Sequence, residues 1–331
     1  MSDTPQSIEM GDYMVSKVSV VVSIYNEEES IEKFHSVCSG ELKKLSRDYE
    51  LIYVNDGSKD NSLKMLTEIA KNDKSVVLVD FSRNFGHEAA MIAGIDYAKG
   101  DCIICMDGDL QHPPAAIHDI VAKFDEGYEI VSMIRTERKD GGLFRKITSN
   151  AFYSVLNRLS GSHFIKNSSD FFAINDKVAR VLRRDYREKV RYLRGYVQSV
   201  GFNATTLEFT AAAREAGQSK YTFSKLIDFS MNTILSFSDA PLRAGIFFGG
   251  IAGLLGIIVM VWTFLDKYVF MNTPDGYPTI IVVICFMFAA LFLLLGIISQ
   301  YIAVLFKEVK DRPIYIVRNI TENGEEKDVT L

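Results

Sequence analysis

Several features are scarce in this chain of 331 residues, and each scarcity argues against a class of protein. The formal net charge is -5 at pH 7, which argues against a nucleic-acid binder because nucleic acids attract basic surfaces. Only four cysteines are present, so we expect no disulfide framework. Cys102 and Cys105 form a Cys-x-x-Cys pair in a predicted strand. Strand positions three apart face opposite sides of a sheet, so we interpret both as packing residues.

Glycine-rich phosphate-binding loops are also missing. No Gly-x-Gly-x-x-Gly follows the first apolar run, which argues against a conventionally bound dinucleotide cofactor. Gly217-Gln218-Ser219-Lys220 lacks the upstream glycine of Gly-x-x-x-x-Gly-Lys-Ser/Thr, which excludes an NTPase phosphate loop. If the chain binds a diphosphate, another group must therefore neutralise the phosphate charge.

Long apolar runs, in contrast, are present towards the C-terminal end. Residues 246–265 and 280–306 contain no charged side chain, and about 20 apolar residues suffice to cross a bilayer. We therefore predict two transmembrane helices, over residues 243–266 and 279–306. The alternative is a buried helical hairpin in a soluble protein. Basic residues flank the runs on their outer sides, which by the positive-inside rule predicts that both termini are cytoplasmic. They are Lys225, Arg243, Lys307, Lys310 and Arg312.

The two ends of the chain are polar. Residues 1–17 lack the apolar core of a signal peptide, so we expect a cytoplasmic N-terminal tail. Residues 307–331 are expected to form a cytoplasmic C-terminal tail that is disordered from residue 321 onward. Within this tail, residues 313–317 could form a short strand against the large domain or a neighbouring subunit.

The first 133 residues alternate β-branched runs with helical patterns. This order predicts an α/β domain with a doubly wound, mostly parallel sheet. The predicted strands are residues 18–24, 50–54, 76–81, 102–106 and 129–133. The predicted helices are residues 27–45, 60–70, 87–98 and 114–124.

Polar residues follow four of these strands directly. Open α/β sheets bind ligands at the carboxyl ends of their strands, so these loops predict a binding site. One such loop alone, for example Asn55-Asp56-Gly57-Ser58, would be ordinary turn chemistry. Asp107-Gly108-Asp109 places two carboxylates at a strand end, which suits a divalent cation and, through it, a diphosphate.

Two further patterns could bring the chain to a membrane surface. Residues 223–241 show helical apolar spacing before Pro241, and we predict an interfacial amphipathic helix there. A core helix of the soluble domain is the alternative. A cluster of basic side chains between residues 135 and 146 has two interpretations. These side chains could contact a substrate phosphate, or they could form a surface that faces water or lipid headgroups. The cluster consists of Arg135, Arg138, Arg145 and Lys146.

Taken together, the motifs resemble those of the inverting GT-A glycosyltransferases of family 2. Val21 to Glu28, Asn55 to Asp60 and Asp107 to Pro113 carry this resemblance. Asn84-Phe85-Gly86-His87 and Arg214-x-x-Gly217-x-Ser219-Lys220-Tyr221 narrow it to the polyprenyl-phosphate glycosyltransferases. These include bactoprenol-phosphate glucosyltransferases and dolichyl-phosphate mannosyltransferases. The resemblance covers residues 18–318 and implies a cytoplasmic GT-A catalytic domain over residues 18–222, with two C-terminal transmembrane helices behind it.

Two departures from the family pattern are visible. Gly108 stands where many relatives carry Ala or Val, which is compatible with a metal loop. The Gln-x-x-Arg-Trp motif of processive relatives is absent, and the only tryptophan, Trp262, lies in an apolar run. Processive polymer synthesis is therefore disfavoured.

The resemblance also implies roles for individual residues. Asp170, Asp109, Arg214 and Lys220 would be catalytic. The nucleotide sugar would be bound by Tyr25, Glu27, Asp56, Asn84, His87, Asp107 and Gly108. Asp109, Gln111 and Asp107 would hold Mg²⁺ or Mn²⁺. Arg135, Arg145, Ser149 and Ser219 would bind a lipid phosphate, and Arg214, Ser219 and Lys220 would lie on a loop that closes over the diphosphates.

The implied reaction is the inverting, metal-dependent transfer of one sugar to undecaprenyl (polyprenyl) phosphate. Glucose from UDP-glucose is the favoured donor, and the product would serve cell-envelope glycans such as lipopolysaccharide. A GDP-mannose-dependent enzyme, an inactive membrane scaffold and a transporter or channel remain alternatives. The family further implies a multi-pass protein of the inner (plasma) membrane and a homo-oligomer, with a tetramer as one form.

Overall fold

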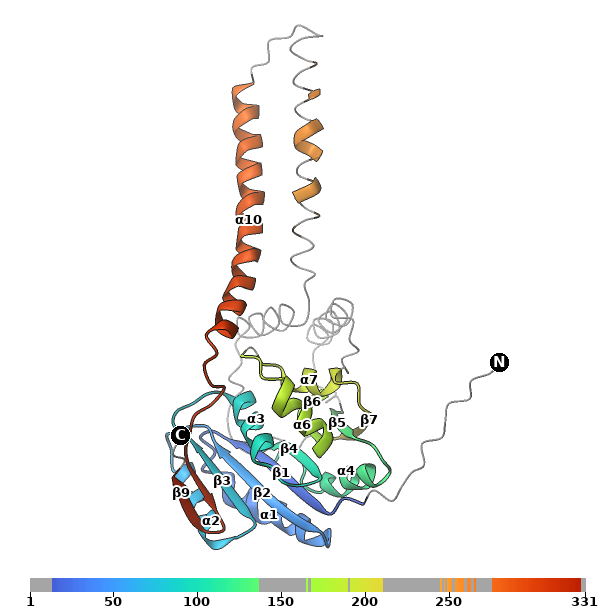
Figure 1. Ribbon diagram of the computed structural model, residues 1–331, viewed down its shortest axis with the longest axis vertical. Helices are drawn as coiled ribbons and strands as arrows, with labels where there is room; N and C mark the ends of the chain where they lie inside the picture. Colours follow the sequence, from blue (N-terminus) through green and yellow to red (C-terminus); the bar gives the residue numbers. More distant parts are fainter. Residues whose placement is uncertain are drawn as a thin grey trace, which may run out of the picture. The chain divides into compact units, whose positions relative to one another are not determined.

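The computed structural model describes residues 14–136, 165, 168–189, 191–210 and 276–328, together with single residues and short stretches between 245 and 265 (Figure 1). The chain divides into two compact units. Residues 1–154, 162–221 and 313–331 belong to an α/β unit, and residues 155–161 and 222–312 belong to an apolar unit. The N-terminal tail up to residue 13 and the predicted amphipathic helix at residues 223–241 lie outside the described residues.

A nine-stranded sheet in the order β7-β5-β6-β4-β1-β2-β3-β8-β9 forms the centre of the α/β unit. The four central strands β3, β2, β1 and β4 are parallel to one another, as the alternation of strands and helices predicts. Outside them, β6 and β8 are antiparallel to their inner neighbours β4 and β3. The strands are β1 Lys17–Ile24, β2 Asp48–Asn55, β3 Val76–Phe81, β4 Cys102–Asp107, β5 Ile130–Arg135, β6 Ser168–Asn175, β7 Ala204–Phe209, β8 Val317–Glu322 and β9 Glu325–Asp328.

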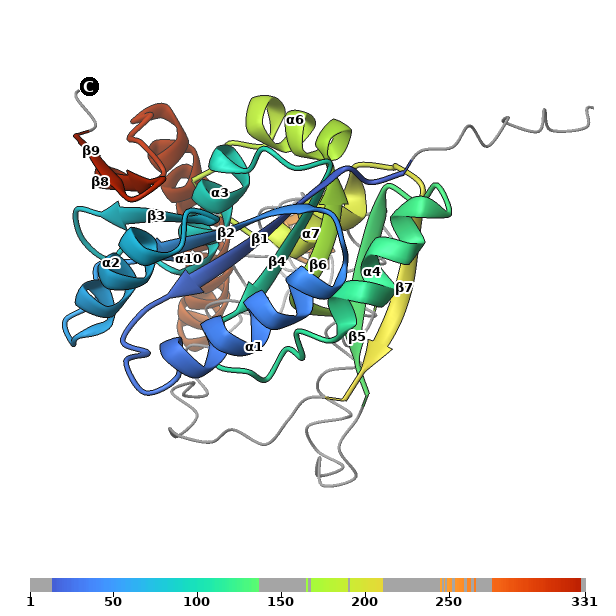
Figure 2. The same cartoon turned by 90° about the horizontal axis from the view of Figure 1, so that it is seen from below.

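Helices cover both faces of this sheet, which gives the predicted doubly wound arrangement (Figure 2). The helices of the unit are α1 Ile31–Lys44, α2 Ser62–Asn72, α3 His87–Tyr97, α4 Ala116–Asp125, α6 Asp176–Asp185 and α7 Leu193–Ser199. Buried side chains of α1, α2 and α4, such as Phe34, Leu66 and Phe124, share one core cluster with Val20 and Val22 of β1. Helix α3 packs against β1 and also contacts α6. Only glycine fits at Gly94 of α3, because a Cβ there would lie 2.0 Å from Val21 Cγ1.

The C-terminal residues extend the sheet. Residues 321–331 were expected to be disordered, and this is wrong for residues 321–328, which belong to the β8–β9 hairpin. The strand expected at residues 313–317 begins only at Val317. Asn323 and Gly324 turn the hairpin with φ of 55° and 83°, the left-handed conformation that Asn-Gly adopts in tight hairpins. Because β8 pairs with β3, the end of the chain covers an edge that would otherwise be exposed.

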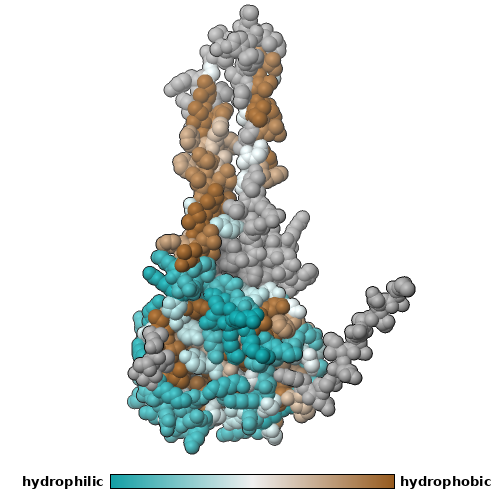
Figure 3. All heavy atoms as spheres, viewed as in Figure 1, coloured by the Kyte–Doolittle hydropathy of each residue, from teal (hydrophilic) through white to brown (hydrophobic). Residues whose placement is uncertain are grey.

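The apolar unit contains α10, Tyr277–Val309, which coincides with the second predicted transmembrane helix. Phe286–Val309 has a mean hydropathy of 2.3 and none of it is buried, so this helix could cross a membrane by length and composition. Figure 3 shows apolar side chains along its surface. Exposed apolar side chains do not fit the alternative of a buried core hairpin.

Among the described residues, α10 is the one helix that is long and apolar enough for a span, so two spans are not confirmed. The first predicted span, residues 243–266, is described only in part. Its described residues include 249–251 and 254–258, which are helical. Within this unit, a Cβ added to Gly245 would lie 2.7 Å from Leu294 of α10.

Candidate active site

Asp56 ties together two of the loops at the carboxyl ends of the strands. It follows β2 directly and is 1% exposed. Its Oδ1 accepts a hydrogen bond from the Phe85 N–H at 2.6 Å, and its Oδ2 accepts one from the Gly86 N–H at 2.9 Å. Burial raises the pKa of Asp56, although these two donors and the charges of His87 and Arg191 oppose the rise. Asp56 therefore fixes the loop that follows β3.

The same two loops touch through their backbones. Gly57 has a φ of +63°, and a Cβ at this position would lie 2.5 Å from the carbonyl carbon of Arg83. The Asn84 side-chain amide donates to the backbone carbonyl of Asp56 at 3.1 Å. Glycine is required at position 57 both for its conformation and for this close approach. Asn84 thus holds a loop in place, and its predicted contact with a nucleotide sugar stays a prediction.

The loop after β1 is fixed to the loop after β2 in a similar way. The Asn26 side-chain oxygen accepts from the Lys59 N–H at 2.8 Å, and the Glu27 N–H donates to the Ser62 hydroxyl at 3.0 Å. Tyr25, immediately before them, is 36% exposed. An exposed aromatic ring on an immobilised loop is a suitable surface for a base to stack on.

The Asp107-Gly108-Asp109 loop continues β4 and leads into a chain of polar contacts. Asp109 Oδ1 accepts from the Gln111 N–H at 3.0 Å, and Oδ2 accepts from the Gln111 side-chain amide at 2.6 Å. The Gln111 Oε1 in turn accepts from Arg135 Nη2 at 3.2 Å. Gly108 packs against β1, because a Cβ there would lie 2.5 Å from Ile24 Cδ1. The structure therefore brings the predicted residues Asp109, Gln111 and Arg135 into one group.

Asp107 lies between two histidines. His87 Nε2 is 3.7 Å from Asp107 Oδ1, whereas His112 Nδ1 is 3.6 Å from Oδ2. His112 Nδ1 accepts the Asp107 N–H at 3.0 Å, so this nitrogen carries no proton and its contact with the carboxylate is not an ion pair. His112 is buried, with its ring stacked on Phe171 at 5.0 Å. Of the two histidines, only His87 is placed to pair with the Asp107 carboxylate.

His87 also faces a group of acidic side chains. Burial by itself lowers the pKa of His87, but the charges of Asp107 and Asp170, followed by Glu88 and Asp56, outweigh it and raise the pKa above its ordinary value. These carboxylates come from the ends of β2 and β4, the start of α3 and strand β6. A histidine with a raised pKa among several carboxylates is typical of sites that handle charged ligands.

Asp170, the predicted acceptor-side residue, lies on β6 opposite Arg194 of α7. Its Oδ1 is 3.8 Å from Arg194 Nη1, and the same nitrogen donates to the Ser168 carbonyl at 3.1 Å. Nearby, Glu88 Oε2 accepts the Leu193 N–H at 2.7 Å. Burial, and then the charge of Asp170, raise the pKa of Glu88 above its ordinary range. Asp170 is thus placed between a cation and a second acid.

Glu88 and Arg194 are the site residues that the sequence reasoning missed. Glu88 follows His87 directly, and its position in the first turn of a helix was the only local signal. Arg194 stands in no motif. The site residues Arg145, Ser149, Arg214, Ser219 and Lys220 lie outside the described residues, so their predicted roles stay predictions.

The oxygen atoms of the Asp107–Gln111 loop match the ligand preference of Mg²⁺ and Mn²⁺, which favour carboxylate and carbonyl oxygens. In the described part of the chain, no three His, Cys, Asp or Glu side chains are grouped as a metal site. Asp107 and Asp109 would therefore supply an incomplete set of ligands. Such a set fits a cation whose remaining ligands come from a bound diphosphate and water.

The sequence of the α/β unit matches one family profile over half of the chain. Residues 19–191 match the profile "Glycosyl transferase family 2". Strands β2 to β6 and the carboxylates described above fall within this range, and β1 begins two residues before it. The chain belongs to glycosyltransferase family 2, and it is a glycosyltransferase.

Curated relatives match along almost their whole length. An uncharacterized glycosyltransferase of Bacillus subtilis, YkcC, is 37% identical over 91% of this chain and 93% of its own. The prophage bactoprenol glucosyl transferase homolog of Escherichia coli is 32% identical over 92% and 99%. The SfII prophage-derived bactoprenol glucosyl transferase of Shigella flexneri is 32% identical over 91% and 97%. The likeness therefore extends beyond the α/β unit into the apolar C-terminal part.

Proposed function

We propose that this protein transfers a single sugar from a nucleotide diphosphate sugar to polyprenyl phosphate at the cytoplasmic face of a membrane. UDP-glucose is the favoured donor and undecaprenyl phosphate the favoured acceptor. The observation that carries the proposal is the group of carboxylates Asp56, Asp107 and Asp109 at the carboxyl ends of the parallel strands β2 and β4, which lie on either side of β1. Two relatives named as bactoprenol glucosyl transferases, which match along more than nine-tenths of this chain, support the choice of sugar and acceptor.

The donor would lie across the loops after β1, β2 and β4. In this proposal the exposed Tyr25 ring stacks on the base, and Glu27, Asp56, Asn84 and His87 bind or position the nucleotide and ribose. Asp109, with Asp107 and Gln111, would hold Mg²⁺ or Mn²⁺ beside the diphosphate. When bound, the cation neutralises the negative charge that develops on the departing nucleoside diphosphate. Gln111 and Arg135 keep the Asp109 carboxylate in place for this role.

The acceptor needs orientation more than it needs a base. A lipid phosphate is already ionised near neutral pH, so its oxygen can attack without losing a proton. That oxygen forms a bond to the anomeric carbon while the bond to the donor's diphosphate oxygen breaks, and the nucleoside diphosphate leaves with the electron pair. Direct displacement inverts the anomeric centre, so an α-linked donor gives a β-linked lipid. We propose that Asp170 orients groups on the acceptor side.

Cationic side chains would hold the two anions close together. Arg194 lies beside Asp170 and is suited to the lipid phosphate, because a guanidinium binds phosphate through two N–H groups. Arg135, Arg145, Ser149 and Ser219 are proposed as further phosphate ligands, and Arg214 and Lys220 as residues that close over the diphosphates. Positioning of the two reactants by such contacts typically contributes several kcal/mol to catalysis, roughly 7–11 in the best-oriented cases.

The membrane location belongs to the same proposal. Helix α10, which carries no charged residue before Lys307, and the apolar residues 243–266 would anchor the enzyme in the inner membrane as a multi-pass protein. Residues 223–241 would lie in the cytoplasmic interface, which would keep the catalytic domain at the level of the lipid phosphate. A homo-oligomer, for instance a tetramer, is proposed from the family resemblance.

A panel of donors tests the proposal. The full-length protein in detergent would be incubated with undecaprenyl phosphate, Mg²⁺ or Mn²⁺, and radiolabelled UDP-glucose, UDP-galactose, UDP-N-acetylglucosamine or GDP-mannose. We expect labelled lipid with UDP-glucose, and its loss when EDTA replaces the cation. Labelling from GDP-mannose alone would establish the mannosyltransferase alternative. No labelled lipid with any donor would contradict the proposed function and favour the inactive scaffold.

A further inference from the structure

The segment that follows α10 in the chain returns to the α/β unit and contacts the end of β3. We call residues 313–318 the return segment. Its Ile316 carbonyl accepts the Ser82 N–H at 2.9 Å, and Arg318 donates to the Ser82 carbonyl at 2.8 Å. Ser82 follows the last residue of β3 and begins the loop that Asp56 holds. The return segment therefore fixes this loop at its first residue.

Tyr315 extends the contact through aromatic packing. Its ring is stacked on Phe81, with centroids 5.2 Å apart and planes at 10°. Phe81 is fully buried and meets Phe85 edge-on at 5.6 Å. Phe85 is one of the two residues whose N–H groups donate to Asp56. A row of three rings thus leads from the return segment to the loop around Asp56.

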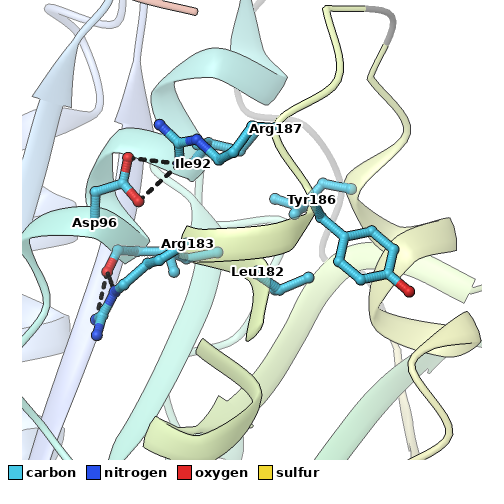
Figure 4. Close-up of a pocket in the computed structure, with 8 residues that line it drawn as sticks. Ile92, Asp96, Leu182, Arg183, Tyr186 and Arg187 are labelled. Carbon is cyan, nitrogen blue, oxygen red and sulfur yellow. Dashed lines mark hydrogen bonds and ion pairs between the residues drawn. The ribbon is translucent and has the colours of Figure 1, made fainter. Parts of the chain in front are cut away.

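The hydroxyl of Tyr315 is anchored on a second element. It donates to Asp96 Oδ2 at 2.7 Å, and both oxygens of Asp96 are 2.9 Å from Arg187 Nη1. Figure 4 shows Asp96 of α3 and Arg187 facing each other beside a small pocket. Burial and the Asp96 charge raise the pKa of Tyr315 far above its usual value, so the hydroxyl remains a donor at all physiological pH values. Tyr315 is therefore held at both ends.

A second connection starts from the neighbouring residue. The Ile314 carbonyl accepts from Arg191 Nη1 at 3.2 Å, and the Ile314 side chain is buried. Arg191 is also one of the charges that act on the Asp56 carboxylate. Two consecutive residues of the return segment thus act on Asp56, one through packed rings and one through a guanidinium.

We infer that the return segment positions the nucleotide-binding loops, with Tyr315 and Arg191 as positioning residues for donor binding. The inference rests on the proposed function, since Asp56 must lie in the nucleotide-sugar site. Neither residue needs to touch the donor. Loosening of the segment would leave the chemistry at Asp109 intact and would weaken the binding of the nucleotide.

The test compares variants of the full-length protein in detergent. Tyr315→Leu removes the stacking on Phe81, Tyr315→Phe removes only the hydroxyl, and Arg191→Gln removes the guanidinium. Tyr128→Leu is the matched control, because Tyr128 follows α4 and makes none of these contacts. Two quantities are measured: the Kd of UDP by calorimetry, and KM and kcat for UDP-glucose and for undecaprenyl phosphate.

We expect Tyr315→Leu to raise both the UDP Kd and the donor KM about tenfold, the scale at which an aromatic pair contributes. Arg191→Gln should raise them about threefold to tenfold, in keeping with one lost charged contact. Tyr315→Phe and Tyr128→Leu should stay within about twofold of wild type, because neither loses the stacked ring pair. The acceptor KM and kcat should remain unchanged, which a general loss of folded structure would not permit.

The outcomes separate this inference from the proposed function. If wild type binds UDP but Tyr315→Leu binds it equally well, the inference is wrong and the proposed function stands. If Tyr315→Leu fails to fold, Arg191→Gln decides, and an unchanged UDP Kd in that variant overturns the inference. If wild type neither binds UDP nor transfers sugar, the proposed function itself has failed.

Discussion

Gln111 donates two hydrogen bonds to the Asp109 carboxylate, one from its backbone and one from its side chain, at 3.0 and 2.6 Å. This pairing orients Asp109 in a loop that also carries Asp107. Asp109 is therefore the residue whose removal should be most damaging to transfer.

Replacement of Asp109 by Ala should abolish the cation-dependent stabilisation of the leaving diphosphate. We expect kcat for sugar transfer to fall by at least about 10²-fold, the loss typical of removing one electrostatic contact in an active site. Asp119→Ala on the exposed face of α4 is the control and should retain full activity. An Asp109→Ala enzyme within tenfold of wild type would contradict the metal assignment.

Asp170 should behave differently, because the phosphate acceptor of the proposed reaction needs no base. We expect Asp170→Asn to lower kcat by about 10- to 100-fold through poorer orientation, while the acid limb of the pH–rate profile keeps its shape. The measurement is kcat/KM for undecaprenyl phosphate between pH 5 and 9. Disappearance of the acid limb in this variant would identify Asp170 as a general base and overturn the orientation role.

The Gly57 position should tolerate no side chain. Gly57→Ala would place a Cβ against the Arg83 backbone and put an alanine in the left-handed conformation. We therefore expect the free energy of unfolding to fall by about 2 kcal/mol or more. Gly40→Ala is the matched control, because a Cβ there meets nothing within 4 Å. Because Gly40 lies within helix α1, its replacement by Ala should raise the free energy of unfolding by about 0.5–1 kcal/mol. Thermal unfolding of both variants checks the contrast, and equal midpoints would refute it.

Acid should loosen the β8–β9 hairpin through Glu322. This residue of β8 accepts hydrogen bonds from the side chains of Lys327 and Lys99, and these contacts lower its pKa to about 2. Because the folded-state pKa lies below the unfolded value, the stabilisation is complete above about pH 4.5 and is lost as the pH falls towards 2. The contribution should be about 1 kcal/mol, since partly exposed ion pairs are screened by water.

Urea unfolding at pH 6 and pH 2.5 measures this dependence. Glu322→Gln should be less stable than wild type at pH 6, and the difference should shrink at pH 2.5. Glu68→Gln on the exposed face of α2 is the control and should follow wild type at both pH values. A difference that stays constant with pH would show that the ionised Glu322 contributes nothing.

Much of the fold could be predicted because its signals are local. The strands β1 to β5 and the four helices between them follow from β-branched runs and helical spacing, and β3 was predicted to the residue. Helix α1 begins at Ile31, four residues later than expected. The reason is that Asn26, with a φ of 55°, and Glu27 form a loop fixed to the next strand end. The β8–β9 hairpin was missed, although Asn323-Gly324 is a strong hairpin signal.

The grouping of the candidate site residues was predictable where they stand in motifs. Asp56, Asp107, Asp109 and Gln111 come from strand ends that meet because the sheet is parallel. Glu88 is different, because its partner Leu193 is 105 residues away in the sequence. Nor does any spacing reveal that Arg194 would reach Asp170 or that Tyr315 would stack on Phe81. Such contacts depend on how α6, α7 and the return segment pack, which a local pattern does not encode.

The place of β8 in the chain has a consequence for biosynthesis. The ribosome must translate both apolar runs before it reaches the strand that covers β3. The sheet of the α/β unit therefore cannot be completed before α10 has been made. A fragment truncated before the apolar runs would leave the β3 edge open to intermolecular pairing. Because β7 and β8 lie on opposite sides of the sheet, a soluble fragment that keeps residues 313–328 needs a linker long enough to cross the sheet from β7.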